Sequence, residues 1–111
     1  MKLLVVDDDV HIRRIVALYL REHDVAEAAT AEEALRRVGG EAFDAVIVDL
    51  ILPQFGGLRL CRKIKESAEP PRVIVMSGDE QLKDEARAAG ADAFLAKPFT
   101  RDALLAVTGN R

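Results

Sequence analysis

The sequence predicts an α/β protein built as a three-layer sandwich, with a five-stranded parallel sheet between two layers of helices. Apolar residues form short continuous blocks at residues 3–6, 46–48 and 73–76, and such blocks are typical of strands buried on both faces. Weaker blocks at residues 25–28 and 93–96 bring the number of expected strands to five. Stretches with helical spacing separate the blocks, so right-handed crossovers are expected to join consecutive strands.

Three of the helices are predicted from apolar side chains that recur at intervals of three and four residues. In the first helix these side chains are Ile12, Ile15, Val16 and Tyr19; in the third, Leu60, Cys61 and Ile64; in the fourth, Leu82, Ala86 and Ala89. The arginines of the first helix, Arg13, Arg14 and Arg21, are expected to face solvent.

Helix ends are predicted from capping residues. Thr30, followed three residues later by Glu33, forms a capping box for the second helix, and the pair of glycines at 39–40 is expected to end it. Gly90 is expected to end the fourth helix, and Thr100 to cap a short fifth helix. Residues 109–111 are expected to form a frayed end.

Composition excludes several classes of protein. The length of 111 residues predicts one domain spanning residues 1–111, and a single cysteine, Cys61, leaves no disulfide framework and no zinc cluster. The 16 Lys and Arg residues are scattered and the net charge is −3, which disfavours direct nucleic-acid binding. No apolar run approaches the roughly 18 residues of a membrane span, and the N-terminus lacks signal-peptide features, so a cytoplasmic protein without membrane contact is expected.

Polar residues follow four of the five expected strands at the point where each strand ends. Asp7 and Asp8 follow the first, Asp49 ends the third, Ser77 follows the fourth and Lys97 follows the fifth. Because the carboxyl ends of parallel strands lie at one edge of a sheet, these side chains are expected to meet in the crevice where ligands bind. Asp9 is instead interpreted as the N-cap of the first helix.

The chemistry of this set predicts a magnesium and phosphoryl site. Three clustered carboxylates repel one another unless a cation lies among them, and hard oxygen ligands suit Mg²⁺. Lys97 and the Ser77 hydroxyl would donate to phosphoryl oxygens. Asp49 is then a nucleophile that forms an aspartyl phosphate.

These residues resemble those of a response-regulator receiver domain, the phosphoacceptor part of two-component signalling systems. The resemblance covers residues 2–107, and its motifs lie at residues 5–9, 48–53 with Gly57, 75–78, and 90–99. It implies the flavodoxin-like, doubly wound fold with strand order 2-1-3-4-5. The chain departs from the commonest family pattern at Gly56, where an acidic residue is usual, and at Ser77, where threonine is commoner.

The resemblance also implies residue roles. Asp49 would be the phosphorylated residue, and Mg²⁺ would be held by Asp8 and Asp49, by Asp7 through water, and by the backbone carbonyl of Ile51. Lys97 and Ser77 would assist as catalytic groups. Ser77 and Phe94 would form the switch that responds to phosphorylation, and the Lys97–Pro98 peptide bond would be cis.

Ile51 and Asp79 lie two residues beyond Asp49 and Ser77, at positions that tune the phosphorylated lifetime in the family. An isoleucine cannot orient water, whereas an aspartate can, so we expect a lifetime of minutes or longer. The implied donor is a sensor histidine kinase or phosphotransfer protein.

The implied readout is a changed surface on the segment from residue 80 through the fifth helix. That surface would regulate an output domain or downstream protein, or form a homodimer, with Leu82, Lys83 and Arg87 as contact residues. The chain would not be an enzyme beyond catalysing its own phosphorylation and dephosphorylation.

Three other kinds of protein share parts of this pattern. A haloacid-dehalogenase-type phosphohydrolase needs a second acid at position 51, where this chain has isoleucine. A flavodoxin-like electron carrier needs a phosphate loop where this chain has three aspartates. A pseudo-receiver that binds partners without phosphorylation is the remaining alternative. His11 and His23 are interpreted as exposed helix residues rather than phosphate acceptors.

Overall fold

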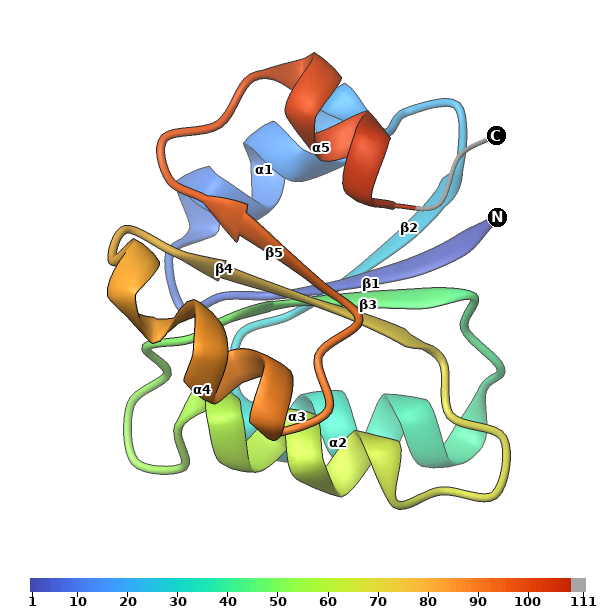
Figure 1. Cartoon of the computed structure of the whole chain (residues 1–111). Helices are drawn as coiled ribbons and strands as arrows, with labels where there is room; N and C mark the ends of the chain where they lie inside the picture. Colours follow the sequence, from blue (N-terminus) through green and yellow to red (C-terminus); the bar gives the residue numbers. More distant parts are fainter. Residues whose placement is uncertain (109–111) are drawn as a thin grey trace.

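Five parallel strands form one sheet in the order β2-β1-β3-β4-β5 (Figure 1). The structure is a computed structural model that describes residues 1–108, so the predicted frayed end lies outside the described residues. The strands are β1 (Lys2–Val6), β2 (Asp24–Ala28), β3 (Ala45–Asp49), β4 (Arg72–Ser77) and β5 (Ala93–Ala96). The predicted strand number, parallel pairing and order are confirmed.

Helices cover both faces of the sheet and complete the three layers (Figure 1). They are α1 (Val10–Tyr19), α2 (Ala31–Gly40), α3 (Gly57–Lys65), α4 (Lys83–Ala88) and α5 (Arg101–Val107). The α1 and α5 helices lie on one face of the sheet, and α2, α3 and α4 lie on the other. None of the helices within residues 1–108 has the length and apolar character that crossing a bilayer requires.

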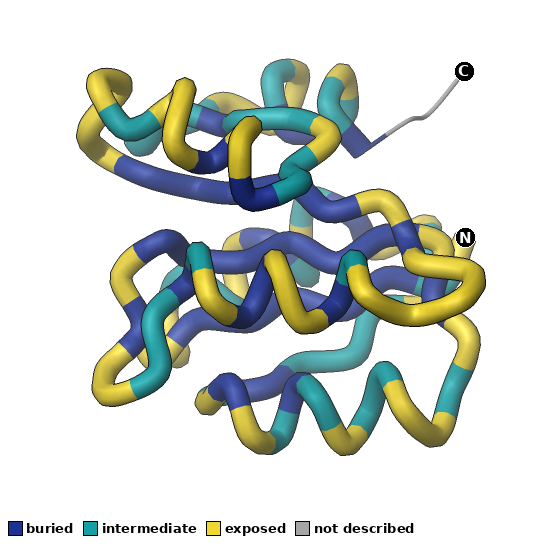
Figure 2. The backbone as a smooth tube through the Cα atoms, turned by 60° about the horizontal axis from the view of Figure 1, so that its bottom comes forward, coloured by how far each residue is buried: buried dark blue, intermediate teal, exposed yellow. Residues whose placement is uncertain are grey.

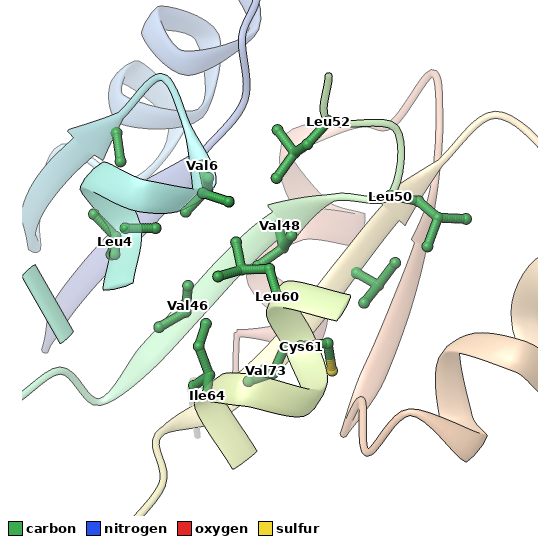
Figure 3. Close-up of a cluster of buried hydrophobic side chains, with 14 of the residues drawn as sticks. Leu4, Val6, Val46, Val48, Leu50, Leu52, Leu60, Cys61, Ile64 and Val73 are labelled. Atoms are coloured by element: carbon green, nitrogen blue, oxygen red, sulfur yellow. The ribbon is translucent and has the colours of Figure 1, made fainter. Parts of the chain in front are cut away.

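The central strands are buried on both faces because their side chains alternate between two apolar clusters. Leu3 and Val5 belong to the cluster beneath α1 and α5, whereas Leu4 and Val6 belong to the cluster beneath α2, α3 and α4. Figure 3 shows the second cluster, where residues of β1 and β3 face those of α3. In Figure 2 the central strands are almost wholly buried, while the helices alternate between buried and exposed residues.

The predicted caps are confirmed at four places. The side chains of Asp9, Thr30 and Thr100 accept hydrogen bonds from the first turns of α1, α2 and α5. Gly90, with φ of 102°, ends α4 in a Schellman arrangement, because its N–H donates to the Arg87 carbonyl and the next N–H donates to the Ala86 carbonyl.

The structure corrects four local predictions. Ile15 is 40% exposed, because it lies about 100° around α1 from the buried Val16, at the margin of the apolar stripe. The glycines at 39–40 lie inside α2, and Glu41 is its C-cap. Leu82 lies in a 3₁₀ turn, η1 (Glu80–Leu82), that precedes α4. His23 lies in the bend before β2 and is half-buried, so it is not an exposed helix residue.

Candidate functional site

The carboxyl edge of the sheet brings together side chains that are distant in the sequence. Asp7 directly follows β1, Asp49 and Ser77 end β3 and β4, and Lys97 directly follows β5. β1 lies between β2 and β3 in the sheet. The connection that follows β1 leads to β2 on one side, whereas the connection that follows β3 leads to β4 on the other side. The two connections diverge at the carboxyl edge and leave a crevice between them, which is where ligands bind in this architecture. The predicted convergence is observed for Asp7, Asp8, Asp49 and Lys97, and Ser77 ends a strand at the same edge.

Three carboxylates form an acid cluster in this crevice. Asp7, Asp8 and Asp49 each offer an oxygen, and these oxygens all lie within 4.8 Å of one another. Asp7 and Asp49 are buried, whereas Asp8 is exposed. Hard carboxylate oxygens at this spacing, one of them open to solvent, fit a divalent cation that keeps several water ligands, as Mg²⁺ does.

Lys97 places a cation against two members of the acid cluster. Its Nζ lies 3.3 Å from Asp7 Oδ2 and 3.4 Å from Asp49 Oδ2. Burial and the nearby charge of Asp49 raise the pKa of Asp7 above its usual range, although the N–H of Asp9 and the ammonium of Lys97 act in the opposite direction. The ammonium group therefore partly compensates the repulsion between two buried carboxylates.

Asp49 is held by its own loop as well as by Lys97. Its Oδ1 accepts a hydrogen bond from the backbone N–H of Ile51 at 3.2 Å. The neighbouring Leu50 N–H donates to the carbonyl of Met76, which ties the end of β3 to β4. The carboxylate is thus oriented toward the crevice from a rigid strand end.

Ser77 is buried and engaged with the loop that follows it. Its hydroxyl oxygen accepts a hydrogen bond from the Asp79 N–H at 3.0 Å. Asp79 is exposed, and its Oδ1 accepts from the Gln81 N–H at 2.9 Å, which caps η1. One oxygen of the Asp79 carboxylate is therefore already used in capping.

Ile51 stands at the opening of the site. The residue is 73% exposed, and it lines an open pocket of about 540 Å³ together with the acid cluster, Gly78 and Lys97. An apolar side chain at the mouth of an acidic pocket provides no group that could orient a water molecule.

Phe94 lies on β5, partly buried against the cluster beneath α2, α3 and α4. It lines a small cavity of about 40 Å³ beside α4, with Lys83 and Arg87 among the other lining residues. The same strand is followed directly by the Lys97–Pro98 peptide bond, which is cis as expected.

Arg13 lies beside the acid cluster, although nothing in the sequence marks it as part of the site. The prediction that it faces solvent is wrong, because its side chain is only 14% exposed. Its Nη1 donates to the backbone carbonyl of Asp7 at 2.7 Å, and its Nε donates to Glu27 Oε1 at 3.0 Å. No local pattern in the sequence indicates these contacts, since they depend on how α1 lies over β1 and β2. His11, in contrast, is exposed on α1 as predicted.

The chain matches the family model of the response regulator receiver domain over residues 3–108. Among curated proteins, it is 34% identical to the transcriptional regulatory protein ResD of Bacillus subtilis over 96% of this chain and 46% of that protein. The chain thus spans about half the length of the curated relatives it matches.

Solved structures agree with the family match. The chemotaxis response regulator CheY4 of Vibrio cholerae has a TM-score of 0.88 at 29% identity, over 95% of this chain and 92% of that chain. A BeF₃-activated receiver domain of DrrB from Thermotoga maritima has a TM-score of 0.86 at 36% identity, over 95% of this chain and 91% of that chain. With an acid cluster, a lysine and a buried serine at the same sheet edge, the chain belongs to the response-regulator receiver domain family.

Proposed function

We propose that this chain is a signalling switch in which Asp49 accepts a phosphoryl group from a sensor histidine kinase or phosphotransfer protein. The observation that carries the proposal is the position of the Lys97 ammonium, 3.3 Å from Asp7 and 3.4 Å from Asp49. The acid cluster is the one group of three or more His, Cys, Asp or Glu side chains within residues 1–108 that are close enough together to hold a metal ion.

The reaction follows from the groups present. A carboxylate oxygen of Asp49 attacks the phosphorus, a new P–O bond forms, and the bond from phosphorus to its donor atom breaks with the electron pair leaving on the donor. Hydrolysis by water later restores the carboxylate and releases inorganic phosphate. Lys97 is already beside Asp49 and would bind one oxygen of the transferred group.

The acid cluster would hold Mg²⁺, with the Ile51 backbone carbonyl as a further ligand. When bound, Mg²⁺ supplies positive charge that offsets the charge on the carboxylates and on the phosphoryl oxygens. The ammonium group of Lys97 would offset the negative charge of the Asp7 carboxylate, which it contacts at 3.3 Å.

Phosphorylation would become a signal through Ser77 and Phe94. A phosphoryl group brings about 1.5 to 2 negative charges and three acceptor oxygens, so it would draw the Ser77 hydroxyl away from the Asp79 N–H. Ser77 and Phe94 lie on adjacent, hydrogen-bonded strands, β4 and β5. Movement of the hydroxyl would therefore be coupled to the Phe94 ring and to the neighbouring α4.

The surface of α4, β5 and α5 would then regulate an output domain or downstream protein, or form a homodimer. Lys83 and Arg87 are exposed on α4, and Leu82 is half-buried beside them, which suits a mixed polar and apolar contact. The similarity to a transcriptional regulator more than twice as long as this chain supports an output domain as the partner. Catalysis would be limited to the chain's own phosphorylation and dephosphorylation.

Phosphorylation is tested by incubation with acetyl phosphate and Mg²⁺, followed by intact mass measurement. We expect one added phosphoryl group on the wild-type chain, none on Asp49→Ala, and normal phosphorylation of the matched control Asp24→Ala, which removes an exposed carboxylate from β2. Beryllofluoride, which activates the DrrB receiver, is expected to bind the wild type and to shift the resonances of Phe94. A wild-type chain that gains no mass and binds no beryllofluoride would instead indicate a pseudo-receiver.

A further inference from the structure

Arg13 connects α1 to β2 directly beside the acid cluster. Its guanidinium donates through Nη1 to the Asp7 carbonyl at 2.7 Å and through Nε to the Glu27 carboxylate at 3.0 Å. Arg13 lies on α1, and Glu27 lies on β2, the strand beside β1 (Figure 1). With the side chain only 14% exposed, the guanidinium is fixed by two partners rather than free in solvent.

The carbonyl that Arg13 contacts belongs to the peptide group between Asp7 and Asp8. Asp7 is buried with its carboxylate beside Lys97, whereas Asp8 is exposed, and an oxygen of each still lies in the acid cluster. The orientation of this one peptide therefore determines how the two carboxylates are presented relative to each other.

The same turn is fixed at two other points. The Asp7 N–H donates to the Ala28 carbonyl at 3.1 Å, and Asp7 Oδ1 accepts from the Asp9 N–H at 2.9 Å. These bonds hold the backbone nitrogen and the side chain of Asp7. Arg13 holds the Asp7 carbonyl, which belongs to the peptide group that joins Asp7 to Asp8.

We propose that Arg13, oriented by Glu27, is a positioning residue that holds the Asp7–Asp8 peptide so that both carboxylates serve one divalent cation. This inference rests on the proposed function, because it takes the acid cluster to be a magnesium site. Residues that orient metal ligands without contacting the metal commonly change metal affinity by about 10- to 100-fold when they are removed.

A purely electrostatic role for Arg13 makes the opposite prediction. A guanidinium near the acid cluster repels a divalent cation, so removal of its charge alone would tighten binding. Loss of positioning would weaken binding instead. The direction of the change in Mg²⁺ affinity therefore separates the two roles.

The test is calorimetric measurement of Mg²⁺ affinity on the folded, metal-free chain, with Mn²⁺ detected by electron paramagnetic resonance as a second probe. We expect Arg13→Gln to weaken Mg²⁺ binding by about tenfold. The control Arg14→Gln, which removes the same charge from an exposed position of α1, is expected to bind as tightly as wild type or slightly more tightly. Arg13→Lys keeps the charge but not the forked geometry, so it is expected to bind more weakly than wild type.

Unchanged or tighter binding by Arg13→Gln would overturn the proposal. If that variant fails to fold, Glu27→Gln provides the second test, since it keeps an oxygen acceptor but weakens the orientation of the guanidinium. Glu27→Gln is expected to bind Mg²⁺ several-fold more weakly, and wild-type affinity would overturn the proposal. A wild-type chain whose Mg²⁺ binding is absent, or is unaffected by Asp8→Ala, would overturn the magnesium site itself and this proposal with it.

Discussion

A Cβ atom at Gly57 would lie 2.3 Å from the backbone carbonyl oxygen of Asp49. The same atom would lie 2.5 Å from the Leu50 Cα and 2.7 Å from the Leu50 carbonyl oxygen, so its three nearest neighbours are all backbone atoms. The Gly57 N–H also donates to the Leu50 carbonyl at 2.9 Å. The first residue of α3 therefore packs directly on the strand end that carries Asp49, and only glycine fits there.

Gly57→Ala is expected to destabilise the chain by about 3 kcal/mol, because backbone atoms at the end of β3 cannot move aside as a flexible side chain could. Urea-induced unfolding measures this loss. The control is Gly39→Ala within α2, where nothing lies within 4 Å of the added Cβ, and which is expected to stabilise by about 0.5 kcal/mol through helix propensity. Equal unfolding free energies for Gly57→Ala and wild type would contradict the close approach.

Asp7→Asn is expected to raise the free energy of unfolding of the metal-free chain by about 1 kcal/mol at neutral pH. The substitution removes a buried charge that burial and Asp49 both disfavour, and it keeps an oxygen that accepts from the Asp9 N–H. Thermal unfolding in a chelating buffer measures the gain. Asp24→Asn, at an exposed position, is the control and is expected to change little; a destabilised Asp7→Asn would show that the Lys97 contact outweighs the repulsion.

Cys61 is expected to resist alkylation in the native state. Burial raises the pKa of its thiol from 9.0 to about 11, so very little thiolate exists at pH 8 and none is accessible to reagent. Mass spectrometry after iodoacetamide treatment should show no adduct on the folded chain and one adduct in urea. Rapid labelling of the native chain would indicate that α3 opens readily from the sheet.

The same raised pKa predicts a loss of stability at alkaline pH. The folded chain holds the thiol proton more tightly than the unfolded chain, so this contribution is complete below pH 9 and is lost as pH rises from about 9 to about 11. The loss attributable to Cys61 is about 2–3 kcal/mol. Unfolding measured from pH 8 to pH 11 for wild type and Cys61→Ala isolates it, and parallel curves for the two proteins would refute the assignment.

Ile51→Asn is expected to shorten the lifetime of phosphorylated Asp49 several-fold. The exposed isoleucine at the mouth of the site cannot bind water, whereas an amide can orient a water molecule toward the phosphoryl group. Loss of the added mass over time after removal of acetyl phosphate measures the lifetime, expected to be minutes or longer for wild type. The control is Leu18→Asn, which changes another exposed apolar residue near the C-terminal end of α1. Identical decay of phosphorylated Ile51→Asn and wild type would contradict the prediction.

The residues that form the sheet could be predicted because burial on both faces leaves a direct mark on the sequence. A strand that contacts helices above and below must be apolar where it lies between them, as β1 is at residues 3–6 and β3 at residues 45–48, and few other structures require such a run. The N-caps were equally predictable from the sequence. The side chains of Asp9, Thr30 and Thr100 accept hydrogen bonds from the first turns of their helices, and these contacts span only a few residues.

Helix boundaries and faces were less predictable. Ile15 shares the spacing of its apolar neighbours and is nevertheless exposed, because the rotation of α1 about its axis is set by contacts with the sheet. The η1 turn before α4 likewise depends on the side chain of Asp79, which caps a turn that the apolar spacing alone assigns to the helix.

The sequence by itself determined the fold class, the five strands and the chemistry at their carboxyl ends, because parallel strands bring their ends to one edge whatever the details of packing. Only the tertiary structure decided how those groups are arranged: Lys97 between two carboxylates, Gly57 against the Asp49 carbonyl, and Arg13 on the peptide between Asp7 and Asp8. Each of these contacts joins separate elements of the chain, and its distance depends on how helices and strands are oriented in space. The spacing of apolar residues along the sequence does not predict that orientation.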